Sequence, residues 1–134
     1  MFILYNIFIN IFCLFSKTYL KIRIKNKKEH PERYLEKLSI TNLPANKNRM
    51  IWFHAASVGE LLSIFPLIDK LLRENLFEKV LVTSITLSSS QIFDQKYKNN
   101  EKIIHQFLPI DKSKFIKNFL DHWKPNALVL IESE

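Results

Sequence analysis

The amino-acid sequence predicts an α/β fold with a parallel sheet, preceded by an apolar N-terminal helix. Two observations support this prediction. Residues 2–15 are apolar apart from two asparagines, and from residue 50 onward short apolar runs alternate with longer amphipathic stretches. The chain has 134 residues, 47% of them hydrophobic and 25% charged, which suits one compact domain and is too little for two. We therefore expect a membrane anchor with a basic flank over residues 1–28, a short helix and linker over 29–49, and one α/β domain over 50–134.

The apolar N-terminal segment has the features of a membrane anchor. Extended to Leu20, it reaches the lower limit of about 17 residues for crossing a bilayer. Between Lys17 and Lys28 the chain carries six basic residues and no acidic residue, whereas the net charge of the protein is +7. Because the positive charge lies beside the apolar run, it indicates an anionic membrane surface as the partner, not nucleic acid.

The order of charges also predicts the side of the membrane. A secretory signal peptide is not expected, because the basic residues follow the apolar run and no small-residue cleavage site is present. A basic flank stays in the cytoplasm, so we expect a cytoplasmic domain after it. Whether the segment spans the bilayer or lies at its surface is left open, and a buried helix of a soluble fold is the alternative.

Four apolar-rich runs with β-branched or aromatic residues have the composition of strands covered on both faces. They are MIWFH (50–54), KVLVTS (79–84), KIIHQFLP (102–109) and ALVLIE (127–132). Between them, apolar residues recur at helical spacing, first at Leu61, Phe65, Ile68 and Leu72 and later at Phe115, Phe119 and Trp123. This alternation predicts βαβ units. Pro66 is expected to kink the first of these helices or to displace its start.

Polar side chains gather where the predicted strands end. Ligands of open parallel sheets bind at this edge. The candidates are His54, Ser57, Gly59 and Glu60 after the first strand, Thr83, Ser84, Thr86 and Ser88 to Ser90 after the second, Pro109 and Asp111 after the third, and Glu132 and Glu134 after the fourth. Hydroxyls and carboxylates with few cations favour a hydroxyl-rich substrate over a polyphosphate. No second His or Cys stands at metal-ligand spacing near His54, so we expect no metal.

The segment HAASVGE (54–60) is the most informative of these groups. Gly59 is the only glycine in the chain, and at a strand-to-helix turn it would let a substrate approach the backbone. Ser57 and Glu60 also have the spacing of a helix-capping box, and spacing alone favours the cap over a catalytic base. Likewise, His54 is interpreted as a hydrogen-bonded structural residue, and the serine run 88–90 as a solvated first helical turn, not a phosphate site.

In their order, these segments resemble the 3-deoxy-D-manno-octulosonic acid (Kdo) transferases of lipopolysaccharide synthesis. The matching stretches are IWFHAASVGE (51–60), LVTSITLSSS (81–90), HQFLPIDKSKFIKNFL (105–120) and P-x5-IESE at the end of the chain. The resemblance implies a Rossmann-like domain that forms the N-terminal half of a GT-B glycosyltransferase. In such enzymes the N-terminal domain receives the lipid A precursor and the C-terminal domain binds the donor CMP-Kdo.

The resemblance also implies roles for individual residues. Glu60 corresponds to the general base that deprotonates the acceptor hydroxyl while CMP leaves, which reverses the preference for a purely capping role. Glu132 would stabilise the transition state. The remaining residues implied on the acceptor side are Ser57, Gly59, Thr83, Thr86 and Glu134. Neither a metal nor a cofactor is expected besides the donor substrate.

The resemblance stops before the donor-binding half of the family. We therefore expect a chain that works with a separately encoded C-terminal half, at the cytoplasmic face of a bacterial inner membrane, with the lipid A precursor and membrane lipids as partners. The alternative is a non-catalytic, membrane-attached remnant of such an enzyme. A nucleotide-binding module unrelated to sugars is disfavoured, because one glycine cannot form a Gly-rich phosphate loop.

Overall fold

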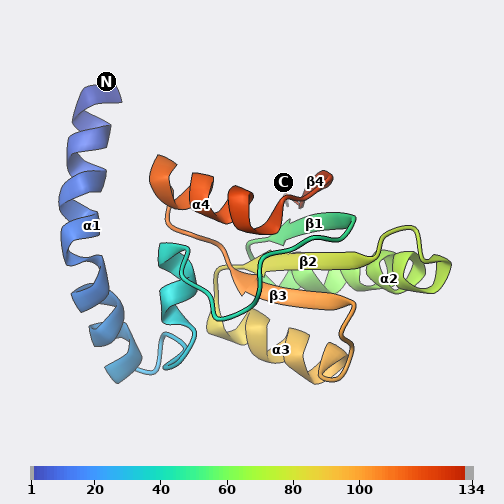
Figure 1. The fold of residues 1–134 in the computed structure, drawn as a ribbon. Helices are drawn as coiled ribbons and strands as arrows, with labels where there is room; N and C mark the ends of the chain where they lie inside the picture. The colour runs from blue at the N-terminus through green and yellow to red at the C-terminus, as the bar shows by residue number, and fades with distance from the viewer. Residues whose placement is uncertain (1, 132–134) are drawn as a thin grey trace.

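A computed structural model describes residues 2–131 of the chain (Figure 1). An N-terminal helix α1 (Phe2–Lys25) and a 3-10 helix η1 (Tyr34–Leu38) precede the sheet domain. That domain alternates strands and helices in the order β1 (Met50–Ala55), α2 (Val58–Glu74), β2 (Lys79–Ser84), α3 (Leu87–Tyr97), β3 (Ile103–Phe107), α4 (Ser113–Trp123) and β4 (Ala127–Ile131). Its strands are parallel and lie in the order β3-β2-β1-β4. The predicted α/β fold with a parallel sheet is confirmed.

Helices cover both faces of this sheet (Figure 1). Successive side chains of β1 point to opposite faces, as the two-residue period of a strand requires. Phe53 packs with residues of α2 and α3 in one apolar cluster, whereas Trp52 packs with Phe119 and Trp123 of α4 in another. Because β1 and β2 lie inside the sheet and are covered on both faces, they read in the sequence as continuous apolar runs.

The strand order creates a switch point at the centre of the sheet. From β1 the chain proceeds outward through β2 to β3, and it then returns through α4 to place β4 on the other side of β1. This is the order of the first four strands in doubly wound sheets, whose ligands bind in the crevice at the carboxyl ends of the two central strands. In this protein, the corresponding position lies beyond Ala55 of β1 and Ile131 of β4, which are partners in the ladder.

Helix α2 tolerates the proline that was expected to disturb it. The helix begins at Val58 and continues through Pro66 to Glu74, so the start of the helix is not displaced. Pro66 lies on the exposed side of the helix. Water can therefore replace the hydrogen bond that the carbonyl of Leu62 loses.

The segment before β1 covers the outer edge of β3. Glu36 accepts a hydrogen bond from the backbone N–H of Phe107 at 2.9 Å, and Arg33 donates from Nη2 to the carbonyl of His105 at 2.8 Å. Arg33 and Glu36 also form an ion pair at 2.8 Å. The two side chains therefore occupy edge groups with which a further strand would otherwise pair.

His105 is buried inside this arrangement. Its Nδ1 atom lies 2.7 Å from Nη2 of Arg33, and its Nε2 atom lies 2.8 Å from the hydroxyl of Ser84. Arginine can only donate, so Nδ1 is the acceptor and Nε2 carries the proton. Burial, and next the positive charge of Arg33, lower the pKa of His105 to about 3. The imidazole is therefore neutral in the folded protein at physiological pH.

Helix α1 stands beside the sheet, on the side to which the carboxyl ends of the strands point (Figure 1). From Ile3 to Lys25, it is the only helix in the described part of the chain that is long and apolar enough to cross a membrane. Most of its apolar side chains are exposed. The predicted apolar N-terminal helix is therefore present.

The low pKa of His105 predicts a pH dependence of stability. The unfolded chain takes up a proton on this histidine near its ordinary pKa of about 6.5, whereas the folded chain does not until the pH approaches 3. The free energy of unfolding should therefore fall as the pH is lowered from about 6.5 toward 3, and His105→Gln should reduce this slope. Denaturant titrations at several pH values measure both slopes, and equal slopes in the two proteins would contradict the assignment.

Candidate functional site

The candidate site is the turn between β1 and α2, residues 54–60, at the switch point of the sheet. The partner of His54 in the ladder is Leu130, and the partner of Ala55 is Ile131. The described chain thus ends beside this turn. Glu132 and Glu134, to which the resemblance assigned roles, lie outside the described residues, so their roles stay predictions.

Ser57 and Glu60 form a complete capping box at the start of α2. The hydroxyl of Ser57 accepts from the backbone N–H of Glu60 at 3.2 Å. In return, Oε2 of Glu60 accepts from the backbone N–H groups of Ala56 at 2.8 Å and Ser57 at 3.4 Å. The capping interpretation of this spacing is confirmed. The same bonds hold the carboxylate in the first turn of α2, where the helix dipole favours a negative charge.

Gly59 lies next to this carboxylate, in the first turn of α2, and is exposed. Its backbone does not have a positive φ angle. A Cβ atom at this position would have the Ser57 hydroxyl as its nearest neighbour, at 4.0 Å, which is ordinary van der Waals contact. Neither backbone conformation nor packing therefore requires a glycine here.

Thr83 connects the floor of the site to β2. It is fully buried, and its hydroxyl accepts from the indole Nε1 of Trp52 at 2.8 Å and lies 3.0 Å from Nδ1 of His54. Because Thr83 has no exposed surface, it can influence the site only through its hydrogen bond with His54. Sequence alone did not indicate this link, because Thr83 is a neighbour of His54 only through strand pairing.

His54 is half-buried at the end of β1. Burial lowers its pKa, while a hydrogen bond with the backbone of Thr83 and the negative charge of Glu60 act in the opposite direction. The net shift is downward, so His54 is uncharged at neutral pH and places no full positive charge beside Glu60. Its hydrogen bond to Thr83 agrees with the interpretation as a hydrogen-bonded residue.

The turn after β2 exposes fewer hydroxyl groups than its sequence suggested. Thr86 is exposed and caps α3, accepting from the backbone N–H of Ser89 at 3.2 Å. The serine run was expected as a solvated first turn, but only Ser88 is exposed, whereas Ser89 and Ser90 are buried. The reason is helical periodicity, because Ser89 lies one turn before the buried Phe93 on the face that packs onto the sheet.

Two further features concern Asp111, another predicted site residue, and a groove elsewhere on the domain. Asp111, after β3, accepts a hydrogen bond at 2.8 Å from the hydroxyl of Tyr5 in α1, which no sequence pattern indicated. A groove of about 910 Å³ runs along the outer edge of β3 between α3 and the linker that contains Leu43, and none of the predicted site residues within the described part of the chain lines it. Within residues 2–131, no cluster of three or more His, Cys, Asp or Glu side chains could hold a metal ion.

Fold and site together define an α/β domain of the doubly wound class, with a fixed carboxylate at its switch point. Residues 29–134 match the family described as 3-deoxy-D-manno-octulosonic-acid transferase (kdotransferase). The chain therefore belongs to the Kdo transferase family.

Relatives with this printed name occur in bacteria and in a plant. The 3-deoxy-D-manno-octulosonic acid transferase of Rickettsia bellii is 40% identical over 114 residues, which are 84% of this chain and 27% of the relative. The probable mitochondrial transferase of Arabidopsis thaliana is 32% identical over 106 residues, covering 79% of this chain and 23% of the relative. The Haemophilus influenzae transferase is 27% identical over 84 residues, which are 63% of this chain and 19% of the relative. The chain thus spans about a quarter of the length of these relatives or less.

The capping box predicts a difference between two substitutions. Ser57→Ala removes the acceptor of the N-cap and should lower the free energy of unfolding by about 1 kcal/mol. Glu60→Gln should cost much less, because glutamine also serves at the third position of a capping box. Denaturant unfolding measures both, with Ser88→Ala in the first turn of α3 as the control. A loss for Ser57→Ala no larger than that for Ser88→Ala would argue against the cap.

Gly59 offers a separate prediction about stability. Because there is room for a methyl group, Gly59→Ala should leave the free energy of unfolding unchanged or raise it by up to about 1 kcal/mol. Thermal unfolding of the two proteins measures this difference. A clear loss of stability would show that this glycine has a packing role that the structure does not explain.

Proposed function

We propose that this chain is the acceptor-binding half of a Kdo transferase with the GT-B arrangement. The reaction is transfer of Kdo from CMP-Kdo to a lipid A precursor in lipopolysaccharide core synthesis. Membership of the family supports the reaction class. The observation that supports a working site is the position of Glu60, whose carboxylate two backbone amides hold at the switch point.

In the proposed mechanism, Glu60 is the proton acceptor. An acceptor hydroxyl that enters over Gly59 gives its proton to the carboxylate while its oxygen attacks the anomeric carbon of Kdo. The bond from that carbon to CMP breaks, and CMP leaves with the electron pair. Held by Ala56 and Ser57, the carboxylate needs no reorientation before it takes the proton, and such preorganisation lowers the barrier.

The other residues are proposed to form the surroundings of this step. Ser57 and Thr86 are exposed on neighbouring turns and present hydroxyls to the acceptor sugar. Thr83 acts through His54. Glu132 and Glu134 follow β4 in the sequence, and we propose that they stabilise the transition state and bind the acceptor, respectively. The proposal requires no metal and no cofactor beyond the donor.

We further propose that transfer needs a donor-binding half that contributes the CMP-Kdo site. The part that this chain matches is about a quarter of each relative, so most of each relative lies outside the match. That half would lie either on a further segment of the same polypeptide or on a separately encoded polypeptide. The proposed location is the cytoplasmic face of a bacterial inner membrane, supported by the apolar α1 and its basic flank.

One observation favours the alternative of a non-catalytic remnant. The Glu60 side chain has a structural task in the capping box, so its presence alone does not require catalysis. A remnant would retain the cap and the membrane helix without any transfer. An activity assay distinguishes the enzyme half from the remnant, because both would have the same fold.

The assay uses Glu60→Gln, because this change keeps the cap and removes the proton acceptor. With a donor-binding half supplied in trans, Kdo transfer from CMP-Kdo to lipid A precursor should fall by about 100- to 10,000-fold. Glu74→Gln, at the other end of the same helix, is the matched control and should keep full activity. Circular dichroism verifies that all three proteins fold. Absence of transfer with two folded wild-type halves would favour the remnant.

A further inference from the structure

We propose that α1 lies in the plane of the membrane surface and does not cross the bilayer, so that its outward apolar side sits at the boundary between the headgroups and the acyl chains of an anionic leaflet. This inference rests on the membrane location given in the proposed function. It adds the orientation of the helix and, from that, the direction in which the candidate site faces.

Polar contacts lie near both ends of α1, one with the sheet domain and one with the segment that directly follows the helix. Near the N-terminus, the hydroxyl of Tyr5 donates to Asp111 at 2.8 Å. At the last turn, Nε of Arg23 lies 3.2 Å from a carboxylate oxygen of Glu29, which is fully buried. Between these contacts, Ser16 and Leu20 are only 2% and 3% exposed. The helix therefore contacts the rest of the chain near both ends and at Ser16 and Leu20, while most of its other side chains stay exposed.

This attachment is incompatible with crossing a bilayer. Eighteen residues separate Tyr5 from Arg23. At about 1.5 Å per residue they span roughly 27 Å, nearly the hydrocarbon thickness of about 30 Å. A spanning α1 would carry Tyr5 through the hydrocarbon, and its partner Asp111 would have to follow. Asp111 is next to Lys112 at the start of α4, and burying such charges in hydrocarbon is costly.

Two stripes on α1 explain how it can contact both protein and lipid. The stripe that faces the body has helical spacing and runs through Ile9, Cys13, Ser16, Leu20 and Arg23, all half-buried or buried. A second stripe, also at helical spacing, is exposed and apolar. It consists of Leu4, Phe8, Ile11, Phe15 and Ile22, with Leu4 and Phe8 more than 70% exposed. An apolar stripe that the protein leaves open suits the acyl boundary of a membrane surface.

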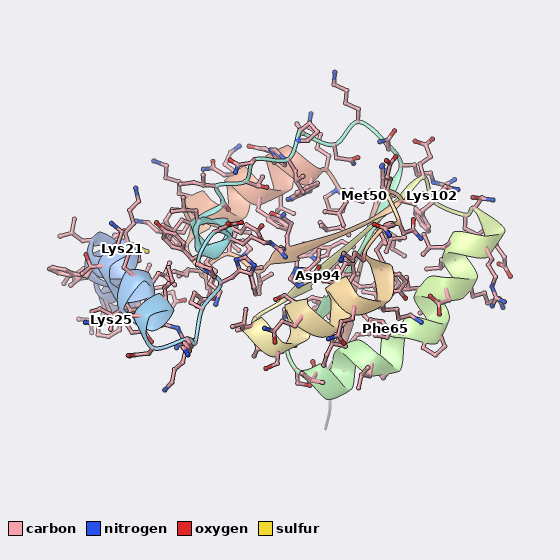
Figure 2. All side chains as sticks on the ribbon, turned by 90° about the horizontal axis from the view of Figure 1, so that it is seen from below. Lys21, Lys25, Met50, Phe65, Asp94 and Lys102 are labelled. Atoms are coloured by element: carbon pink, nitrogen blue, oxygen red, sulfur yellow. The ribbon has the colours of Figure 1, made fainter. Side chains whose placement is uncertain are left out.

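The charges of α1 favour an anionic lipid as the occupant of this surface. Lys17, Lys21 and Lys25 are exposed, and their spacing of four residues places them along one side of the helix. Each basic residue near an anionic leaflet contributes about 1 kcal/mol to binding. Lys21 and Lys25 lie at the end of the molecule that is remote from Met50 and Lys102 at the amino ends of the strands (Figure 2).

The orientation has a consequence for the candidate site. The carboxyl ends of the strands point toward α1, so the sheet edge at which α2 begins lies on the side of α1 (Figure 1). Glu60 is in the first turn of α2 and therefore belongs to this edge. An acceptor lipid could then keep its acyl chains in the leaflet while its sugar reaches the rim. The arrangement explains why a lipid substrate would not have to leave the membrane.

Protease accessibility tests this orientation on the full chain with an N-terminal affinity tag. In inverted inner-membrane vesicles, the tag and the body should both be cleaved, and in spheroplasts both should be protected. Cleavage of the tag in spheroplasts, with cleavage of the body only in inverted vesicles, would overturn the proposal. So would recovery of the chain outside the membrane fraction. Kdo transfer is assayed separately. If transfer is absent while the expected accessibility pattern is observed, the proposed function is contradicted and the orientation of α1 is not.

A distance measurement tests the contact that carries the inference. Spin labels are placed by Leu4→Cys and Lys114→Cys in a Cys13→Ala background, in vesicles that contain phosphatidylglycerol. The wild-type contact predicts one narrow, short distance, whereas labels separated by about 30 Å of hydrocarbon would contradict it. Tyr5→Phe removes the donor to Asp111 and should broaden the distribution. Tyr34→Phe, the same change outside α1, is the control and should not.

Discussion

The site depends on one set of hydrogen bonds, those between the carboxylate of Glu60 and the backbone amides that follow β1. Strand β1 lies inside the sheet and is covered on both faces, so the turn after it begins from a rigid base. The cap then fixes the start of α2 relative to β1. A carboxylate that closes this turn is automatically presented at the switch point, where ligands of such sheets bind. Capping of α2 and the proposed acceptance of a proton are therefore compatible in Glu60, because the hydrogen bonds that order the turn also orient the carboxylate.

Much of the fold was predictable because local signals and tertiary structure agree. The apolar runs at 50–54 and 79–84 became β1 and β2 with nearly the same bounds, since strands covered on both faces carry continuous apolar sequence. The spacing of Phe119 and Trp123 likewise marked the face of α4 that packs onto the sheet. The order of the strands was not predictable from these signals. It depends on which side of β1 the chain takes after β3, and no local pattern encodes that choice.

Within the site, sequence spacing predicted the capping box correctly, whereas the catalytic role of Glu60 came only from the resemblance. The burial of Thr83 and Ser89 could not be predicted, because a hydroxyl at a strand end or in a first helical turn has the same sequence signature whether it faces solvent or the sheet. The contact between Tyr5 and Asp111 joins residues 106 positions apart. Such contacts depend on how elements pack in space, so only the structure reveals them.

The central claim is that the carboxylate that caps α2 also receives the proton of the acceptor sugar. A structure of the chain with a bound lipid A precursor tests it most directly. The account predicts an acceptor hydroxyl oxygen about 2.6–3.2 Å from the Glu60 carboxylate, with the bonds from Ala56 and Ser57 retained. An acceptor bound instead in the groove along β3, with its hydroxyls out of reach of Glu60, would contradict it.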